Sequence, residues 1–258
     1  MSASSLTEWA MRHDRLVVIS SLSAVVLLSW LYLLNGAGLM QSMDGMLMPM
    51  SAGPWTLTDA LLMFAMWVVM MAAMMLPSAS PTILLYGVIA RRRHPDSAFP
   101  LASGAFILGY VVAWTMFSLM AVSLQFALQQ AALISPMMGL TSVALAGTVL
   151  IATGVYQLTP LKQACLRHCR SPLEFITTQW RTGVNGAFSM GLRHGVYCVG
   201  CCWSLMLLLF VGGVMNFAWI GGIALFVLVE KLAPAGRWTS RGAGVLLIFW
   251  GAATLLSM

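Results

Sequence analysis

The sequence predicts an all-α integral membrane protein, a polytopic bundle of about seven transmembrane helices. Of its 258 residues, 60% are hydrophobic and only 8% are charged, whereas soluble domains carry roughly 25% charged residues. The apolar residues are also grouped into runs of about 20, the length that an α-helix needs to cross a bilayer. Helices are expected because backbone polar groups must be paired inside lipid, and the alternating pattern of a β-barrel is absent.

Seven apolar runs account for the predicted spans, and the whole chain, 1–258, is expected to form one membrane domain. The second run contains Pro77 and Pro81, which predict a kink or local unwinding in a Met-rich helix. The third run is longer than one crossing, so we expect it to be tilted or to project from the bilayer. The predicted spans are 15–35, 58–89, 98–129, 136–158, 195–214, 217–233 and 241–257.

The basic residues predict the orientation of the bundle. With seven spans, all 13 of them fall on one side of the membrane. Positive charge is retained in the cytoplasm, so we expect a cytoplasmic N-terminus and an external C-terminus. The net charge of +6 is then a topology signal, and no basic patch interleaved with stacking aromatics indicates nucleic-acid binding. The residues are Arg12, Arg15, Arg91, Arg92, Arg93, Lys162, Arg167, Arg170, Arg181, Arg193, Lys231, Arg237 and Arg241.

The predicted external loop, residues 36–57, is rich in methionine. Five thioethers lie within the eleven residues from Met40 to Met50. A thioether needs no deprotonation to bind a metal, and soft sulfur ligands select Cu(I) over hard cations. The alternative is an interfacial loop in which Met serves as adaptable packing against lipid. The candidate ligands in this loop are Met43, Met46 and Met48.

A second group of methionines forms a stripe along the second predicted span. At about 100° per residue, one helical face carries a line of Met that leads to the proline pair. Freed carbonyls and hydroxyls between the two prolines are expected to line a cavity there. Packing is the alternative interpretation, since Met fills irregular gaps well. The stripe consists of Met63, Met66, Met70 and Met74, flanked by Met71 and Met75.

All five cysteines fall between residues 165 and 202, in or next to a predicted cytoplasmic loop of residues 159–194. Thr159 and Pro160 are an N-cap and a first helical residue. Ser171 and Glu174 have the spacing of a capping box, which predicts a second short helix. The loop is therefore expected to contain short helices that carry part of the cysteine cluster.

Two groups of cysteine and histidine side chains share helical faces in this region. Such groups are typical of metal or redox sites. The alternatives are packing, because free Cys behaves as a small hydrophobe, and disulfides, which the cytoplasmic side and the odd count disfavour. Whether the two groups form one site or two is left open. The first group is Cys165, His168 and Cys169, and the second is His194, Cys198, Cys201 and Cys202.

Glu230 is an ionisable residue at the cytoplasmic end of the sixth predicted span, beside Lys231. Ionisable groups near membrane depth are functional candidates. The alternative is a simple ion pair at the membrane interface. Glu230 is therefore a further candidate for the functional site.

Four segments of the chain form recognisable motifs, namely the runs 67–77, 156–169 and 191–203 and the Glu230–Leu232 motif. Together they resemble a bacterial family of predicted metal-binding integral membrane proteins. The resemblance covers most of the chain from about residue 55 onward and implies a metal site in a multi-pass protein of the bacterial inner membrane. It does not name the metal or a reaction, and the external Met-rich loop lies outside it.

Three functions fit these residues. The first is copper handling, either transport or delivery within the membrane, with a metallochaperone or a cuproenzyme as partner. The second is a metalloenzyme or redox subunit acting on a lipid-soluble substrate, for which zinc, iron or haem also remain open. The third is a thiol–disulfide relay through Cys198, Cys201 and Cys202. Copper handling uses both the thioethers and the Cys/His groups, and it is the function that we expect.

Overall fold

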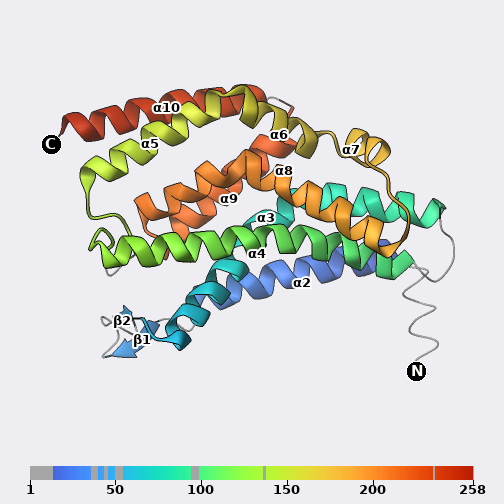
Figure 1. Ribbon diagram of the computed structural model, residues 1–258, viewed down its shortest axis with the longest axis horizontal. Coiled ribbons are helices and arrows are strands. Elements are labelled where there is room, and N and C mark those ends of the chain that lie inside the picture. Colours follow the sequence, from blue (N-terminus) through green and yellow to red (C-terminus); the bar gives the residue numbers. More distant parts are fainter. Residues whose placement is uncertain are drawn as a thin grey trace.

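The protein is a bundle of long helices that run along the longest axis of the molecule (Figure 1). The computed structural model describes residues 14–35, 40–43, 46–49, 55–93, 99–135, 138–234 and 236–257. Within these ranges it contains nine α-helices and one β-hairpin. They are α2 (Asp14–Leu34), β1 (Met40–Met43), β2 (Met46–Pro49), α3 (Leu57–Arg93), α4 (Phe99–Gln130), α5 (Val143–Leu158), α6 (Pro160–Arg170), α7 (Pro172–Thr178), α8 (Gly183–Gly212), α9 (Phe217–Leu232) and α10 (Gly236–Leu256).

The helices have the length and composition of a multi-pass membrane protein. In the described ranges, four helices are long and apolar enough to cross a bilayer, namely α3, α4, α8 and α10, and the bent pair α5 and α6 makes a fifth if it is one span. The shorter apolar helix Val18–Leu34 in α2 is 17 residues long, and α9 has 16 residues. The all-α class is thus confirmed, whereas seven crossings and their orientation stay predictions.

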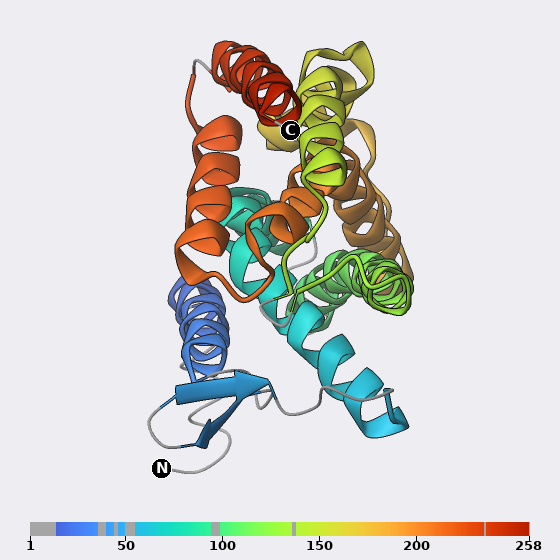
Figure 2. The ribbon, with the colours of Figure 1, turned by 90° about the vertical axis from the view of Figure 1, so that its left-hand side faces the viewer.

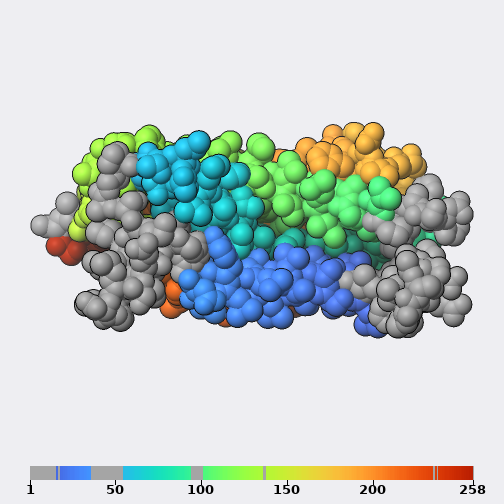
Figure 3. Space-filling view, turned by 90° about the horizontal axis from the view of Figure 1, so that it is seen from below, coloured from blue at the N-terminus to red at the C-terminus, as the bar shows by residue number. Residues whose placement is uncertain are grey.

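The outer surface of the bundle is strongly apolar. Leu28 is 64% exposed on α2, and Leu246 and Phe249 are each 70% exposed on α10. Figure 3 shows α2 lying lengthwise on one face of the molecule, where its outward side chains meet the surroundings. Apolar surface of this extent in water would be a large exposed patch, so these faces are those expected to contact lipid.

The predicted Met-rich loop contains the hairpin. Its two strands are antiparallel and pair Met43 with Met46 across the turn. The hairpin lies at the same end of the molecule as the C-terminus of α4 and the C-terminus of α10 (Figure 1). Residues 36–39, 44–45 and 50–54 of this predicted loop lie outside the described residues.

The second predicted span is α3, a continuous helix that contains both prolines. Pro81 has no N–H to donate to the carbonyl of Pro77, and the hydroxyl of Ser80 donates to that carbonyl instead, at 2.8 Å. The carbonyl of Met75 accepts from Ser78 Oγ at 2.9 Å. The Ser80 hydroxyl thus replaces one lost backbone bond, and the helix bends along its length (Figure 1) but does not unwind.

Helix α8 packs along α4 at very short distance. A Cβ on Gly109 of α4 would collide with the carbonyl of Phe188, and a Cβ on Gly191 of α8 would collide with the carbonyl of Phe106. Small residues let transmembrane helices approach in this way. Figure 2, which views the bundle from one end, shows α5 and α10 on one side of this pair and α2 on the other. The α4–α8 contact is therefore a close interface between two long helices of the bundle.

The cytoplasmic loop predicted at 159–194 is partly helical. Thr159 is the N-cap of α6, its hydroxyl accepting from Lys162 N at 3.3 Å, with Pro160 in the first turn, as predicted. The predicted capping box at the start of α7 is wrong, because Ser171 makes no side-chain cap bond and also ends α6. Glu174 instead forms an exposed ion pair with Arg167 at 3.6 Å.

Helix α8 begins at Gly183, 12 residues before the predicted start of the fifth span at residue 195. The predicted boundary directly follows the polar pair Arg193 and His194. However, Ala187 and Met190 are fully buried, and their burial keeps this segment helical. His194 therefore sits inside α8, one turn before Cys198.

Candidate metal centre

The cysteines of α6 and α8 come together in the interior of the bundle. Cys169 Sγ lies 3.9 Å from Cys201 Sγ, and Cys201 Sγ lies 3.2 Å from Cys202 Sγ. Cys198, Cys201 and Cys202 are at most 1% exposed, and Cys169 is 8% exposed. All five cysteines of the chain are free thiols. The two groups of the sequence thus form one buried cluster, which we call the cysteine cluster (Cys165, Cys169, Cys198, Cys201 and Cys202).

Cys165 lies at the edge of this cluster and is partly exposed. Its sulfur packs against Gly200 of α8, where an added Cβ would be 2.8 Å from Cys165 Sγ. The carbonyl of Gly200 accepts a hydrogen bond from Tyr156 at 2.5 Å. The glycine between Cys198 and Cys201 therefore lets α6 approach α8 closely enough for the sulfurs to meet.

A lysine ammonium group contacts the cysteine cluster. Lys231 Nζ lies 2.9 Å from Cys198 Sγ and donates to Ser78 Oγ at 3.0 Å. Lys231 is 5% exposed and comes from the C-terminal end of α9. A buried ammonium beside a sulfur atom favours the thiolate, which is the form that binds soft metals.

Tyr110 of α4 connects the cysteine cluster to the methionines of α3. Its hydroxyl lies 3.1 Å from Cys198 Sγ and 3.2 Å from the carbonyl oxygen of Met75. One phenol group therefore contacts both the backbone of Met75, which flanks the inner end of the stripe, and the sulfur of Cys198.

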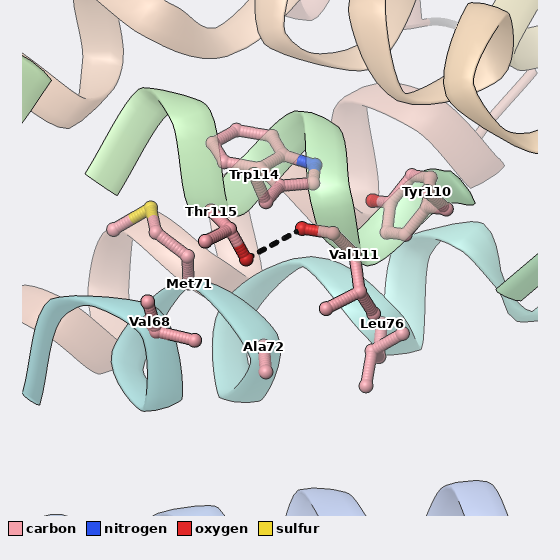
Figure 4. Close-up of a pocket in the computed structure, with 8 residues that line it drawn as sticks. All are labelled: Val68, Met71, Ala72, Leu76, Tyr110, Val111, Trp114 and Thr115. Carbon is pink, nitrogen blue, oxygen red and sulfur yellow. Dashed lines mark hydrogen bonds between the residues drawn. The ribbon is translucent and has the colours of Figure 1, made fainter. Parts of the chain in front are cut away.

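The methionine stripe of α3 is buried along its length. All of its members from Met66 to Met75 are at most 1% exposed. Met71 extends toward Trp114 of α4, and both line a cavity of only about 10 Å³ between α3 and α4 (Figure 4). A cavity of this size is at the lower limit for one water molecule. The cavity therefore has no room for a hydrated ion between Met71 and Trp114.

His194 is enclosed by aromatic rings. Its ring centroid lies 5.2 Å from that of Phe175, 5.7 Å from that of Tyr110 and 6.2 Å from that of Phe106. The side chain is 2% exposed, and among the described residues its Nδ1 has no hydrogen-bond partner. Buried polar atoms are almost always satisfied, so this nitrogen has the free lone pair or proton expected of a group that awaits a ligand.

His168 lies outside the buried part of the cluster. It is partly exposed and stacks on Tyr197, with ring centroids 4.1 Å apart. Its Nδ1 lies 3.0 Å from the carbonyl oxygen of Ala164, and since a carbonyl only accepts, Nδ1 is the donor. This arrangement leaves Nε2 as the free nitrogen, as in many metal-binding histidines.

Glu230 forms a buried ion pair with Lys162 of α6, with 2.6 Å between Oε1 and Nζ and both side chains fully buried. Lys162 also donates to Gln157 Oε1. In the described part of the chain, Glu230 Oε2 has no hydrogen-bond partner. Glu230 is therefore not at the interface but inside the bundle, where it joins α9 to α6 directly beside the lysine that contacts Cys198.

Two pairs of sulfurs in the cluster are close enough to bind one metal ion together. Two sulfurs bound to one metal at about 2.3 Å each lie at most about 4.6 Å apart, and both close sulfur pairs meet this limit. However, no three His, Cys, Asp or Glu side chains of the described residues are arranged as a metal-binding group. Structural zinc and Fe–S clusters need four ligands, and thiolate is also a ligand that Cu(I) prefers, so the donor set is compatible with Cu(I).

Several of the predicted site residues lie apart from the cysteine cluster, and the side chains of others are not among those that the structure describes. Pro77 and Pro81 flank Ser78, which binds Lys231. Met43, Met46 and Met48 lie on the hairpin, and their side chains are outside the described set. Sequence reasoning missed Tyr110, a lone hydroxyl in an apolar helix, and treated Lys231 only as a neighbour of Glu230. The available signal for Lys231 was its charge inside an otherwise apolar run.

A family model described as "PpoB2: Copper chaperone" matches residues 64–254. The match includes the methionine stripe from Met66 onward, the whole cysteine cluster and Lys231. No curated protein and no solved structure matches the chain significantly.

Proposed function

Because the chain belongs to the PpoB2 copper chaperone family, we propose that it holds Cu(I) inside the membrane and delivers it to a copper-requiring protein. The thioethers of α3 conduct the ion, and the cysteine cluster, with His194 beside it, receives it. The Cu(I) is cargo in this account and is not a resident cofactor. Soft sulfur ligands of both kinds select Cu(I) over harder cations.

The observation that carries the proposal is the junction at Tyr110. The methionine stripe ends at Met75, and the hydroxyl of Tyr110 lies within 3.2 Å of both the Met75 carbonyl and Cys198 Sγ. One side chain thus bridges the backbone of α3, at the inner end of the methionine stripe, and a sulfur of the cysteine cluster. Packing alone explains buried Met or buried Cys, but it does not require such a bridge between them.

The charges in the centre favour a monovalent ion. Cu(I) bound by two thiolates forms a complex of charge −1, and its binding releases the thiol protons. The ammonium of Lys231, 2.9 Å from Cys198 Sγ, neutralises such a complex in the low-dielectric interior. A divalent ion with the same two thiolates would leave an uncompensated positive charge on Lys231, which is costly when buried.

The direction of transfer follows from the ligands and the predicted topology. With a cytoplasmic N-terminus, the methionine end of α3 faces outward and the cysteines face the cytoplasmic side. Thiolates bind Cu(I) more tightly than thioethers, so copper moves inward. No nucleotide-binding motif is present in the sequence, so the affinity gradient, rather than ATP hydrolysis by this chain, drives the transfer. The partner is a metallochaperone or a cuproenzyme, and the location is the bacterial inner membrane.

The experiment that tests this function is elemental analysis of the detergent-purified chain. We expect near-stoichiometric copper in the wild type and a loss of most of it when Cys198, Cys201 and Cys202 are all changed to Ser. Met116→Leu is the matched control, since Met116 is 54% exposed on α4 and should leave the copper content unchanged. Stoichiometric zinc or iron, or copper that survives the triple substitution, would refute the proposal.

A thiol–disulfide relay is the second candidate, and the proximity of the sulfurs favours it. Cys169 Sγ and Cys201 Sγ, 3.9 Å apart, need to move closer by about 2 Å to form a disulfide. A relay predicts a cysteine pair that cycles with oxidant and binds no stoichiometric metal.

A metalloenzyme predicts turnover of a lipid-soluble substrate that depends on the cysteine cluster but not on the hairpin. The same elemental analysis separates copper handling from the relay.

A further inference from the structure

Two methionines from different parts of the chain meet one buried amide group. Gln125 Nε2 lies 3.6 Å from Met63 Sδ and 3.5 Å from Met138 Sδ, and donates to both sulfurs. Gln125 is fully buried, and Met138 is 9% exposed. Met63 belongs to α3 and Met138 to the connection between α4 and α5. The structure therefore brings together two thioethers that are 75 residues apart in the sequence.

The orientation of this amide is fixed. Trp67 Nε1 donates to Gln125 Oε1 at 2.7 Å, so the amide oxygen faces the indole and the NH₂ group faces the sulfurs. A flipped amide would place its NH₂ against the indole N–H, which cannot accept. Each sulfur uses one lone pair for a weak hydrogen bond and keeps the other, so Gln125 positions both thioethers without consuming their capacity to bind a metal.

Met138 is held in an unfavourable backbone conformation. Its φ is +58°, in the left-handed region that residues with side chains rarely adopt. Two backbone hydrogen bonds hold this residue in place. Met138 N donates to the carbonyl oxygen of Ser135 at 2.8 Å, and Val214 N donates to the carbonyl oxygen of Met138 at 3.3 Å. Strained residues of this kind persist where the surroundings over-determine them, and they cluster at functional sites. A glycine would avoid the strain, so the presence of Met at this position indicates that its side chain has a function.

This thioether pair lies at the end of the bundle where the methionine stripe begins. The N-terminal end of α3, the C-terminal end of α4 and the Met-rich hairpin are all at that end (Figure 1). Trp55, just before α3, is tied to α4 by a 2.8 Å bond from Nε1 to Gln129 Oε1 and by an edge contact with Phe126. Met66, the first fully buried member of the stripe, follows Met63 by one helical turn along α3.

We propose that Met63 and Met138, positioned by Gln125, form an outer thioether site that takes up Cu(I) at the outer end of the methionine stripe, before the ion reaches the buried members from Met66 onward. The inference rests on the proposed copper function and adds the place where the ion is first held. Two neutral thioethers bind a soft monovalent ion without releasing protons, and they bind it more weakly than the cysteine cluster. The site therefore captures Cu(I) reversibly and passes it toward Met66.

The test uses the full chain in which Cys169, Cys198, Cys201 and Cys202 are changed to Ser, so that the inner centre does not compete. Anaerobic titration with Cu(I) against a chromophoric Cu(I) chelator measures the remaining affinity. We expect Met63→Leu and Met138→Gly to weaken Cu(I) binding about tenfold or more, and Gln125→Leu about tenfold, because its role is to position the sulfurs. Met138→Gly removes the thioether while relieving the backbone strain. Met120→Leu, at an exposed position of α4 (61%), is the matched control and should change nothing.

A second measurement keeps the inference testable if the four-Ser variant does not fold. In the chain with its cysteines intact, ultraviolet Cu(I)–thiolate absorption follows loading of the inner centre. We expect Met138→Gly to slow loading severalfold and to leave the final stoichiometry unchanged. Unchanged affinity and unchanged loading in both methionine variants would overturn the outer site. Absence of the thiolate absorption in the unsubstituted chain would instead overturn the proposed function, so the two failures are distinguishable.

Discussion

A Glu230→Gln substitution is expected to lower the free energy of unfolding by about 3–5 kcal/mol, the typical effect of breaking a buried ion pair. Glu230 and Lys162 are both fully buried and 2.6 Å apart, so the neutral amide leaves the lysine charge unpaired in the interior. Gln157 Oε1 accepts one bond from that ammonium but carries no compensating charge. Thermal unfolding of the detergent-solubilised variant and wild type measures the difference.

The matched control removes both charges at once. A Lys162→Met, Glu230→Leu double substitution is expected to be close to neutral in stability, because replacing a buried pair by apolar residues removes the desolvation penalty of both ions. If Glu230→Gln destabilises the protein by less than about 1 kcal/mol, or if the double variant is worse than the single one, the ion pair does not join α6 to α9 in the way described here.

Replacement of Lys231 by Met is expected to weaken Cu(I) binding by about 30-fold or more. The estimate corresponds to about 2 kcal/mol, the lower range for removing one partner of a buried, hydrogen-bonded charge pair. Lys231 Nζ lies 2.9 Å from Cys198 Sγ, and without it the negative copper–dithiolate complex has no counter-charge there. Competition with a chromophoric Cu(I) chelator measures the affinity.

Two further variants separate charge from packing at this position. Lys231→Arg keeps the positive charge and should retain most of the affinity, whereas Lys231→Met keeps most of the volume and should not. Ser78→Ala removes the 3.0 Å bond to the ammonium but not its charge, so its effect should be small. Equal affinity in wild type and Lys231→Met would contradict the charge argument.

The helices could be predicted from the sequence because their signals are local. Apolar length predicted α3, α4, α9 and α10 to within about five residues at each end, and Thr159 with Pro160 predicted the start of α6. The start of α8 was predicted wrongly, since Arg193 and His194 are polar and the burial of Met190 against its neighbours is a tertiary effect. The local sequence therefore predicts where the helices lie better than it predicts the residues at which they begin and end.

The meeting of the sites could not be predicted, because it depends on contacts between distant segments. Helical spacing placed Cys165 and Cys169 on one face of α6, but their approach to Cys201 requires the close packing that Gly200 permits. Tyr110 is one hydroxyl in an apolar helix, and nothing in its neighbourhood along the chain indicates that it touches both Met75 and Cys198. The candidate residue types followed from the sequence, and their convergence followed from the fold.

In the proposed route, a soft ion enters at the thioethers of the hairpin end of α3 and passes along the buried methionines. It then reaches the thiols near Tyr110, which have a lysine counter-charge. The last step moves from neutral to anionic sulfur, which raises the affinity for Cu(I). The copper chaperone family of the chain and the softness of its buried sulfur ligands agree with this cargo.

The most direct test of this account is copper K-edge X-ray absorption of the Cu(I)-loaded protein. The account predicts Cu(I) bound by two or three sulfurs at about 2.2–2.3 Å, with the sulfur signal reduced in the variant in which Cys198, Cys201 and Cys202 are Ser. A spectrum dominated by nitrogen or oxygen ligands, or one that is unchanged by the triple substitution, would contradict the claim that the cysteine cluster receives the copper.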